Sequence, residues 1–550
     1  MRPTLSICMI IKNEEEVLTR CLESIKGIAD EIIIVDTGST DSSKFIGIKY
    51  TNMVFDYKWE GNFSNARNFA ASKATGEWIL ALDADEYVDR ESLLNFKEEL
   101  KENPPEENII AVQIVNFLGT SGNSTSLNYH ERLYKNDGSI MYYRNIHELL
   151  KHKDSKENRG LVEFQIFHTG YMGKVEKEKD KSKRNLSMLI NKKDKEPIDY
   201  YFIGNEYDKL GELNEAIDYY KNGFALKDNI NSYWVKKLLV RLINSLQRAN
   251  KNNEALEIAE TCEKIYSDIV DYRFFKAKIY YEKGDFGFAK SIFEDILMKK
   301  DVFIANSSGD YLEFLPHLYL GEIFEKDNQL HLAVQHYTKA ISINDLDDYV
   351  WMRLINLLGQ HSTKDDLEIF INKNCLNRKS MSQVRMVKIL LSVPNLNIQK
   401  LTKSIGNSGL SNNEQEALSI KLLFIEGEFE GIMKILDEKS INELNKLLSI
   451  GIFNLVDFIL LTIVTNKPHF KSFLKDLKSK NSINNLLSVL FGKRKKLSSF
   501  EEELFIALLK QAHIISNSKL MINLNKKIDT LSVKSKIRYK KEMTQYKLIK

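Results

Sequence analysis

The chain has 550 residues, which is enough for more than one domain with its own core. Its 79 basic and 76 acidic residues give a formal net charge of only +3, so the overall charge does not favour nucleic acid or an anionic membrane as a partner. The four cysteines are too few and too scattered for a disulfide framework or a zinc site. We recognise no signal peptide and no apolar run near the ~20 residues that span a bilayer, which favours a cytoplasmic protein without a membrane span.

From residue 4 to about 170, short apolar runs alternate with segments of helical periodicity. The expected strands are 5–11, 31–35, 53–55 and 78–82, and the expected helices are 14–25 and 62–74. Strands that alternate with helices indicate βαβ units and a parallel sheet. Three more strands are expected at 109–117, 129–135 and 161–168. Because no long helices separate them, they predict a mixed extension of the sheet.

From about residue 198 the periodicity is helical throughout, and a pattern of small and aromatic residues recurs. Three copies share the same offsets: Gly204, Tyr207, Gly211, Ala216, Tyr220 and Gly223; Ala277, Tyr280, Gly284, Ala289, Phe293 and Ile296; and Gly321, Phe324, Asn328, Ala333, Tyr337 and Ala340. Small residues let two helices approach closely and aromatic residues fill the groove, so the pattern resembles tetratricopeptide repeats. We predict three domains, 1–190, 198–346 and 347–550, the last a further helical region with degenerate repeats and a basic tail.

The most informative feature is a short apolar run that ends in two carboxylates, Asp83 and Asp85. Residues two apart on an extended segment point the same way, so these carboxylates would repel each other unless a cation lay between them. Oxygen ligands suit Mg²⁺ or Mn²⁺, and open α/β sheets bind ligands outside the carboxyl ends of their strands. A solvated acidic turn is the alternative.

Other polar segments also fall on the expected rim of the sheet. They are Lys12-Asn13-Glu14, Asp36 to Asp41, Trp59 to Asn68, and His147-Glu148 with His168. In chain order the motifs read I-K-N-E-E, V-D-T-G-S-T-D, F-S-N-A-R-N and L-D-A-D-E, then R-L-Y-K-N, I-H-E and H-T-G-Y. Over about residues 4–175 this series resembles the family 2 glycosyltransferases. Together with the repeats, it is similar to the branch with the sublancin S-glycosyltransferase and other peptide glycosyltransferases, and to lipopolysaccharide-core glucosyltransferases.

The resemblance implies an α/β domain of GT-A fold (Rossmann-like, mixed sheet), followed by an all-α repeat domain, and an enzyme that uses a nucleotide sugar, first of all a UDP sugar. The implied nucleotide-sugar-binding residues are Asn13, Glu14, Asp36, Arg67, Asp83 and Glu86. The implied ligands of Mn²⁺ or Mg²⁺ are Asp85, Asp83 and His168. In this interpretation the cation neutralises the departing diphosphate, Asp36 lies near the base and Asp83 near the ribose.

Each role has a structural alternative. Asp36 could cap the next turn. Arg67 could form a salt bridge with Glu60 or Asp85, and His168 could be a satisfied core group.

An inverting transfer needs a general base that takes the proton of the acceptor. Glu148 is our first choice, with His147 and Asp137 as competitors. We expect the repeats to hold a peptide or protein acceptor or to mediate a homodimer, since helical repeats commonly bind extended partners. A cell-envelope glycan or lipid-linked acceptor is the alternative. The alternative that is not an enzyme is a catalytically inactive repeat scaffold for protein binding.

Overall fold

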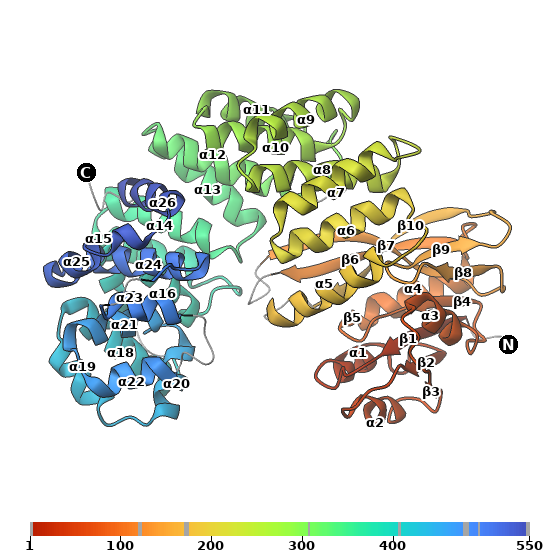
Figure 1. The fold of residues 1–550 in the computed structure, drawn as a ribbon, viewed down its shortest axis with the longest axis horizontal. Coiled ribbons are helices and arrows are strands. Elements are labelled where there is room, and N and C mark those ends of the chain that lie inside the picture. The colour runs from red at the N-terminus through yellow and green to blue at the C-terminus, as the bar shows by residue number, and fades with distance from the viewer. Residues whose placement is uncertain are drawn as a thin grey trace. The chain divides into compact units, whose positions relative to one another are not determined.

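The computed structural model describes residues 4–118, 124–169, 175–305, 308–404, 409–476, 483–492 and 495–545 (Figure 1). The chain divides into two compact units, Met1–Asp327 and Asn328–Lys550. The boundaries predicted near residues 190 and 346 stay predictions. Gly170 and Tyr171 of the H-T-G-Y motif, and residues 546–550 of the basic tail, lie outside the described residues.

The N-terminal unit begins with an eight-stranded sheet of order β3-β2-β1-β4-β7-β6-β10-β5. Its strands are β1 (Leu5–Ile11), β2 (Glu31–Asp36), β3 (Val54–Asp56), β4 (Trp78–Ala81), β5 (Glu86–Val88), β6 (Ile109–Leu118), β7 (Ser124–Lys135) and β10 (Arg159–His168). β1 to β4 are parallel, whereas β7 runs antiparallel to both β4 and β6. β10 is parallel to β6, and β5 is antiparallel to β10. This mixed sheet confirms the predicted fold class.

Apolar residues alternate along β1 and build a core on each face of the sheet. The helices of this part are α1 (Leu18–Ile25), α2 (Ser43–Ile48), α3 (Phe63–Ala71), α4 (Arg90–Glu102) and α5 (Val175–Ile190). Leu5, Ile7 and Met9 belong to the core that α1 and α4 cover, and Cys8 belongs to the core on the side of α3. Each large apolar side chain buried in this way contributes about 1.5–3 kcal/mol. The packing holds the carboxyl ends of β1, β2 and β4 at one rim.

A hairpin outside the main sheet precedes β10. It consists of β8 (Ile140–Tyr143) and β9 (Leu149–His152), which pair antiparallel. Residues 144–148 connect the two strands, and α3 packs against β8. The hairpin therefore brings Glu148 beside the helix that carries Arg67.

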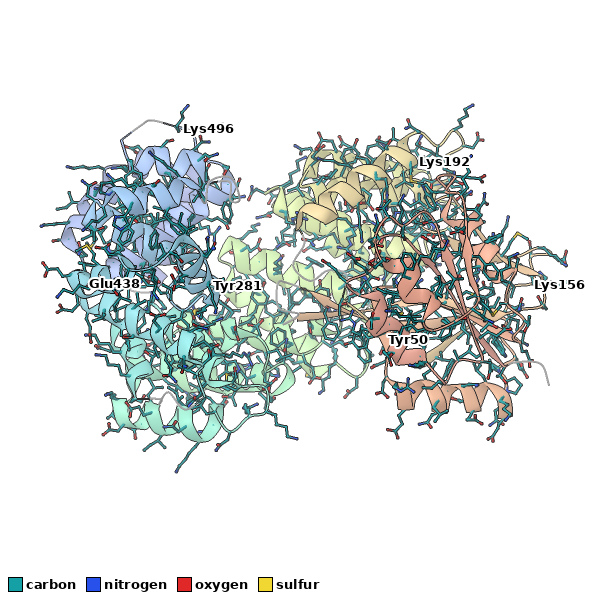
Figure 2. All side chains as sticks on the ribbon, turned by 90° about the horizontal axis from the view of Figure 1, so that it is seen from below. Tyr50, Lys156, Lys192, Tyr281, Glu438 and Lys496 are labelled. Atoms are coloured by element: carbon teal, nitrogen blue, oxygen red, sulfur yellow. The ribbon has the colours of Figure 1, made fainter. Side chains whose placement is uncertain are left out.

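Helices that each pack against the next complete the N-terminal unit. They are α6 (Pro197–Leu210), α7 (Leu213–Ala225), α8 (Tyr233–Arg248), α9 (Asn252–Ile265), α10 (Val270–Lys283), α11 (Phe286–Met298) and α12 (Phe314–Lys326). Lys192, labelled in Figure 2, lies in the connection between α5 and α6. A Cβ atom on Gly204 would lie 2.5 Å from the ring of Tyr220, so the close approach of α6 and α7 requires glycine. Ala216 and Tyr220 are fully buried, as the repeat pattern predicts.

The C-terminal unit is helical in its described residues. Its α-helices are α13 (Leu330–Ile343), α14 (Asp348–His361), α15 (Lys364–Phe370), α16 (Gln383–Ser392), α17 (Leu396–Lys400), α18 (Asn412–Glu426), α19 (Phe429–Leu436), α20 (Ile441–Ile450), α21 (Leu455–Thr465), α22 (Pro468–Asp476), α23 (Asn484–Leu490), α24 (Ser499–Ile514), α25 (Ser518–Asn525) and α26 (Val533–Gln545). In the apolar α21, Asp457 pairs with Lys421 at 2.6 Å. Among the described helices, none is long and apolar enough to cross a membrane.

Candidate functional site

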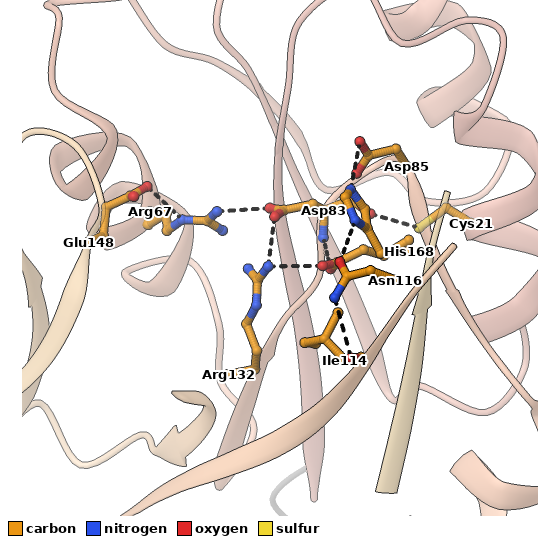
Figure 3. A network of polar contacts seen from close by, with 10 residues as sticks. Cys21, Arg67, Asp83, Asp85, Ile114, Asn116, Arg132, Glu148 and His168 are labelled. Carbon is orange, nitrogen blue, oxygen red and sulfur yellow. Dashed lines mark hydrogen bonds and ion pairs between the residues drawn. The ribbon is translucent and has the colours of Figure 1, made fainter. Parts of the chain in front are cut away.

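Polar residues from five elements meet at the rim formed by the carboxyl ends of β1, β2 and β4 (Figure 3). Asp83 and Asp85 lie in a turn there, since β4 ends at Ala81. The N–H of Glu86 donates to the carbonyl of Asp83 at 3.0 Å, and Glu86 Oε2 accepts the N–H of Asp83 at 2.8 Å. Asp83 consequently faces two arginines and Asp85 faces His168 (Figure 3). The expectation that the two carboxylates point the same way is wrong, because the chain leaves the extended conformation before them.

Asp83 is held by two guanidinium groups. Arg67 Nη2 from α3 donates to Oδ1, and Arg132 Nη2 from β7 donates to Oδ2, both at 2.8 Å. Burial favours the neutral acid, but Arg132 and Arg67 outweigh it and hold the pKa of Asp83 well below its usual range. Arg67 does form a salt bridge, as its structural alternative proposed, but not with Glu60 or Asp85. Asp83 therefore stays ionised and fixed in position.

Glu86 supports the turn from inside the protein. It is only 2% exposed, and its Oε1 accepts a hydrogen bond from Arg132 Nη2 at 2.9 Å. Burial raises the pKa of Glu86 to about 7, with Asp83 and Asp85 adding to the rise and Arg132 opposing it. The role of Glu86 in binding the nucleotide sugar stays a prediction.

Asp85 and His168 form a second polar group beside the first. Asp85 Oδ2 lies 3.2 Å from His168 Nε2, and His168 Nδ1 lies 2.9 Å from Asn116 Oδ1. The amide oxygen accepts, so Nδ1 carries the hydrogen and Nε2 is directed at Asp85. Burial lowers the pKa of His168, but Asp85 and the neighbouring carboxylates raise it overall.

This pair offers a carboxylate oxygen and an imidazole nitrogen to a cation. In the part of the chain that the structure describes, no cluster of three His, Cys, Asp or Glu is placed to hold a metal. Mg²⁺ and Mn²⁺ commonly take one or two protein ligands and complete their shell with substrate phosphates and water. Asp85 and His168 therefore fit such a cation, whereas both oxygens of Asp83 are taken by arginines.

Hydrogen bonds join the loops after β1 and β2. Asn13 Oδ1 accepts the N–H of Thr40 at 2.8 Å, and the N–H of Glu14 donates to Ser43 Oγ at 2.7 Å. Asp36 Oδ1 accepts the N–H of Ser39 at 2.9 Å, so Asp36 does cap the next turn. α1 begins only at Leu18, later than the predicted helix 14–25, because a turn in which the N–H of Val17 donates to the carbonyl of Glu14 at 3.1 Å precedes it. Asn13 and Glu14 thus shape the rim through the neighbouring loop.

The three candidate bases lie in different surroundings. Glu148 Oε1 accepts from Arg67 Nε at 3.1 Å, which joins Glu148 to the network of Asp83. His147 instead stacks on Phe202 of α6, with ring centroids 4.0 Å apart, and burial lowers its pKa to about 3.

Asp137 follows β7, which pairs with β4 so that Lys135 lies opposite Trp78. Asp137 therefore lies at the opposite rim from Asp83 and does not belong to the site.

Two residues of the network had no role in our prediction from sequence. Arg132 was part of the R-L-Y-K-N motif, where a basic residue inside an expected buried strand was the available signal. Asn116 lies at the end of an apolar strand beside His168, as the register of β6 and β10 shows. A polar residue ending a buried strand was the signal there.

Two family models match this chain. Residues 6–157 match Glycosyl transferase family 2, and residues 200–229 match a tetratricopeptide repeat. The N-terminal domain is a family 2 glycosyltransferase domain. The match confirms the predicted enzyme class, the GT-A type of fold and the fusion to repeats.

Individual relatives of this glycosyltransferase show how far the likeness extends. The SPbeta prophage-derived glycosyltransferase SunS of Bacillus subtilis is 26% identical over 287 residues, which is 50% of this chain and 67% of SunS. A TPR repeat-containing protein of Synechococcus elongatus is 37% identical over 145 residues, 26% of this chain and 35% of that protein. Among solved structures, S. aureus TarS 1–349 in complex with UDP-GlcNAc has 19% identity and a TM-score of 0.26, covering 51% of this chain and 92% of that one.

Proposed function

We propose that this glycosyltransferase moves a sugar from a UDP sugar to a peptide or protein acceptor, with inversion and with the help of Mn²⁺ or Mg²⁺. The observation that supports the proposal most strongly is one continuous network. It runs from Glu148 through Arg67, Asp83 and Arg132 to Glu86, beside the pair Asp85 and His168 (Figure 3). Different groups of this site are available to the nucleoside of the donor, to its diphosphate and to the acceptor.

The donor half of the proposal rests on Asp36 and Asp83. Asp36 Oδ1 caps the turn after β2, and no hydrogen bond to Oδ2 is found among the described residues, so Oδ2 is left to accept a ring N–H of the base. Asp83 is kept ionised by Arg67 and Arg132, and each of its oxygens accepts one arginine N–H, so the second lone pair of each oxygen is the proposed acceptor for a ribose hydroxyl group.

A cation held by Asp85 and His168 would supply positive charge to the diphosphate as it leaves. Asn116 fixes the ring of His168 through Nδ1, and Thr169 holds the backbone of Asp85 by donating its N–H to the Asp85 carbonyl at 3.3 Å. Residues that orient metal ligands in this way raise the affinity of a site.

Glu148 is the proposed general base. Arg67 Nε donates to Oε1, and no hydrogen bond to Oε2 is found in the part of the chain that the structure describes, so Oε2 is left to take the proton from the hydroxyl or thiol of the acceptor. The acceptor atom then bonds to the anomeric carbon, and the bond from that carbon to the diphosphate oxygen breaks. His147 is the weaker choice, since its ring is stacked on Phe202.

The acceptor half of the proposal rests on the helical repeats. Tyr233, Lys237 and Arg241 follow at intervals of four on α8 and so share one face of that helix. Tyr233 is 56% exposed and Arg241 is exposed, which offers an aromatic and a cationic contact to an extended chain. Burial, and after it the positive charges of Arg132 and Lys237, lower the pKa of His130 on β7, so the face of α8 that carries Lys237 lies near the sheet. A peptide remains the first choice, and an envelope glycan or lipid-linked acceptor the second.

A cytoplasmic location and a homodimer complete the proposal. All four cysteines are free and buried, as expected of a protein in a reducing compartment.

The test of the base assignment is Glu148→Gln. With a panel of UDP sugars and Mn²⁺, we expect hydrolysis and transfer to fall ~10²-fold or more while UDP binding is retained. Glu106→Gln, at an exposed position, is the matched control and should keep the wild-type rate. A Glu148→Gln protein with wild-type turnover would show that the base is elsewhere. A wild-type protein that turns over no donor would contradict the proposed function.

A further inference from the structure

The segment Arg144–Glu148 has an unusual backbone. Arg144 (φ 80°) and His147 (φ 53°) are both in the left-handed region, which residues other than glycine seldom adopt. Such a conformation persists only where surrounding contacts determine it. The segment ends at Glu148, so these contacts also decide where the carboxylate lies.

On one side the segment is bound to the N-terminus of α3. Ser64 Oγ donates to the carbonyl of Arg144 at 2.5 Å, and the N–H of Phe63 donates to the carbonyl of Asn145 at 2.9 Å. Asn62, the N-cap of α3, donates its Nδ2 to Asn145 Oδ1 at 2.9 Å. The same helix carries Arg67, which hydrogen-bonds Glu148.

On the other side the segment is bound to α6, the first helix of the repeat region. The Arg144 side chain is 3% exposed and forms ion pairs with Glu196 and Asp199. The ring of His147 stacks on Phe202 at 4.0 Å with an interplanar angle of 10°.

Two further contacts extend this side. His147 Nε2 lies 3.7 Å from Glu206 Oε1. Ile146 packs in a cluster with Leu189 and Ile203. Four of the five residues of the segment thus contact α3 or α6 through backbone or side chain before Glu148 is reached.

We propose that helix α6 positions Glu148, with Arg144 and His147 as positioning residues that act through Asp199 and Phe202. The first repeat helix is then a structural part of the catalytic domain. The inference rests on the proposed function in that Glu148 is the base. It also gives His147 a task that suits a neutral ring stacked on an aromatic residue, in place of proton transfer.

The decisive variant is Phe202→Ala, which removes the ring beneath His147. Phe202→Tyr keeps the ring and should rescue the effect. Tyr200→Ala is the matched control on the same helix, since Tyr200 packs on Tyr219 of α7, with ring centroids 6.2 Å apart. Should Phe202→Ala fail to fold, Phe202→Leu keeps apolar volume and removes only the flat ring.

Two measurements on the full chain test the proposal. Amide hydrogen exchange over residues 144–148 should be ~10-fold faster in Phe202→Ala and unchanged in Phe202→Tyr and Tyr200→Ala. With the UDP sugar that the wild type hydrolyses fastest, kcat should fall ~10-fold or more while the donor KM stays within about twofold.

Unchanged exchange in Phe202→Ala would overturn the proposal, because α6 would not hold the segment. Faster exchange with an unchanged kcat would also overturn it, because the held position would not matter to the reaction. If the wild type hydrolyses no donor, the proposed function fails on its own, and the exchange measurement alone decides whether α6 supports the segment.

Discussion

Arg132 holds two acidic groups at once, and Arg132→Met tests the charge network of the site. Its Nη2 donates to Asp83 Oδ2 at 2.8 Å and to Glu86 Oε1 at 2.9 Å. Methionine keeps the apolar stem and removes both bonds. Because hydrogen bonds to charged groups contribute about 1.5–3 kcal/mol each, we expect the N-terminal unit to lose about 3 kcal/mol of its free energy of unfolding at pH 7.

The loss depends on pH because of Glu86. Burial raises its pKa from 4.5 to about 7 in the folded protein. The folded state therefore binds more protons than the unfolded state between these values, and stability falls as the pH rises through this range. Without Arg132 the pKa of Glu86 rises further, so the fall continues above pH 7 at about 1.4 kcal/mol per pH unit. Asp83, with a pKa held well below its usual range, is ionised in both states there and adds nothing.

Urea unfolding at pH 6 and pH 9, followed by tryptophan fluorescence, measures the effect. Trp59, Trp78 and Trp234, three of the four tryptophans, belong to the N-terminal unit. Arg159→Met is the matched control, because the Arg159 side chain is 46% exposed and pairs with Glu131 on the same sheet. We expect it to cost less than about 1 kcal/mol, independent of pH. An equal loss for Arg132→Met at pH 6 and pH 9 would refute the reasoning about Glu86.

Gly204→Ala should destabilise the repeats by about 1–3 kcal/mol, because its Cβ would lie 2.5 Å from the ring of Tyr220. Gly287→Ala, where no atom lies within 4 Å of the new Cβ, should stabilise by about 0.4–1 kcal/mol, and equal unfolding midpoints for the two variants would contradict the packing argument. Asn116→Leu should weaken Mn²⁺ binding ~10–100-fold, measured as free Mn²⁺ by electron paramagnetic resonance, because His168 loses the partner that orients its ring. Unchanged binding would show that Asn116 does not act on the metal site.

The sequence predicted the sheet well because its strands are encoded locally. β1, β2 and β4 are short apolar runs bounded by polar residues, and each was found within one residue of its expected end. The repeats were also predicted well, because small and aromatic residues recur at fixed offsets. In the first copy, Ala216 and Tyr220 are fully buried. The strands β5, β8 and β9 were missed.

The partners within the site were harder to predict, because they come from distant parts of the chain. Arg67 reaches Glu148 across 81 positions, and Arg132 reaches Asp83 across 49. No local sequence pattern predicts a pair of residues so far apart in the chain. The divergence of Asp83 and Asp85 was missed for a different reason, since a turn after β4 interrupted the extended spacing on which the prediction depended.

In the proposed reaction Asp85 and His168 hold a cation that helps to bind the diphosphate of the donor. Calorimetry of UDP binding with and without Mn²⁺, in the wild type and in Asp85→Asn, tests it most directly. We predict that Mn²⁺ raises the affinity of the wild type for UDP ~10-fold or more and that Asp85→Asn loses this gain. An Asp85→Asn protein that keeps the full Mn²⁺-dependent gain would contradict the account.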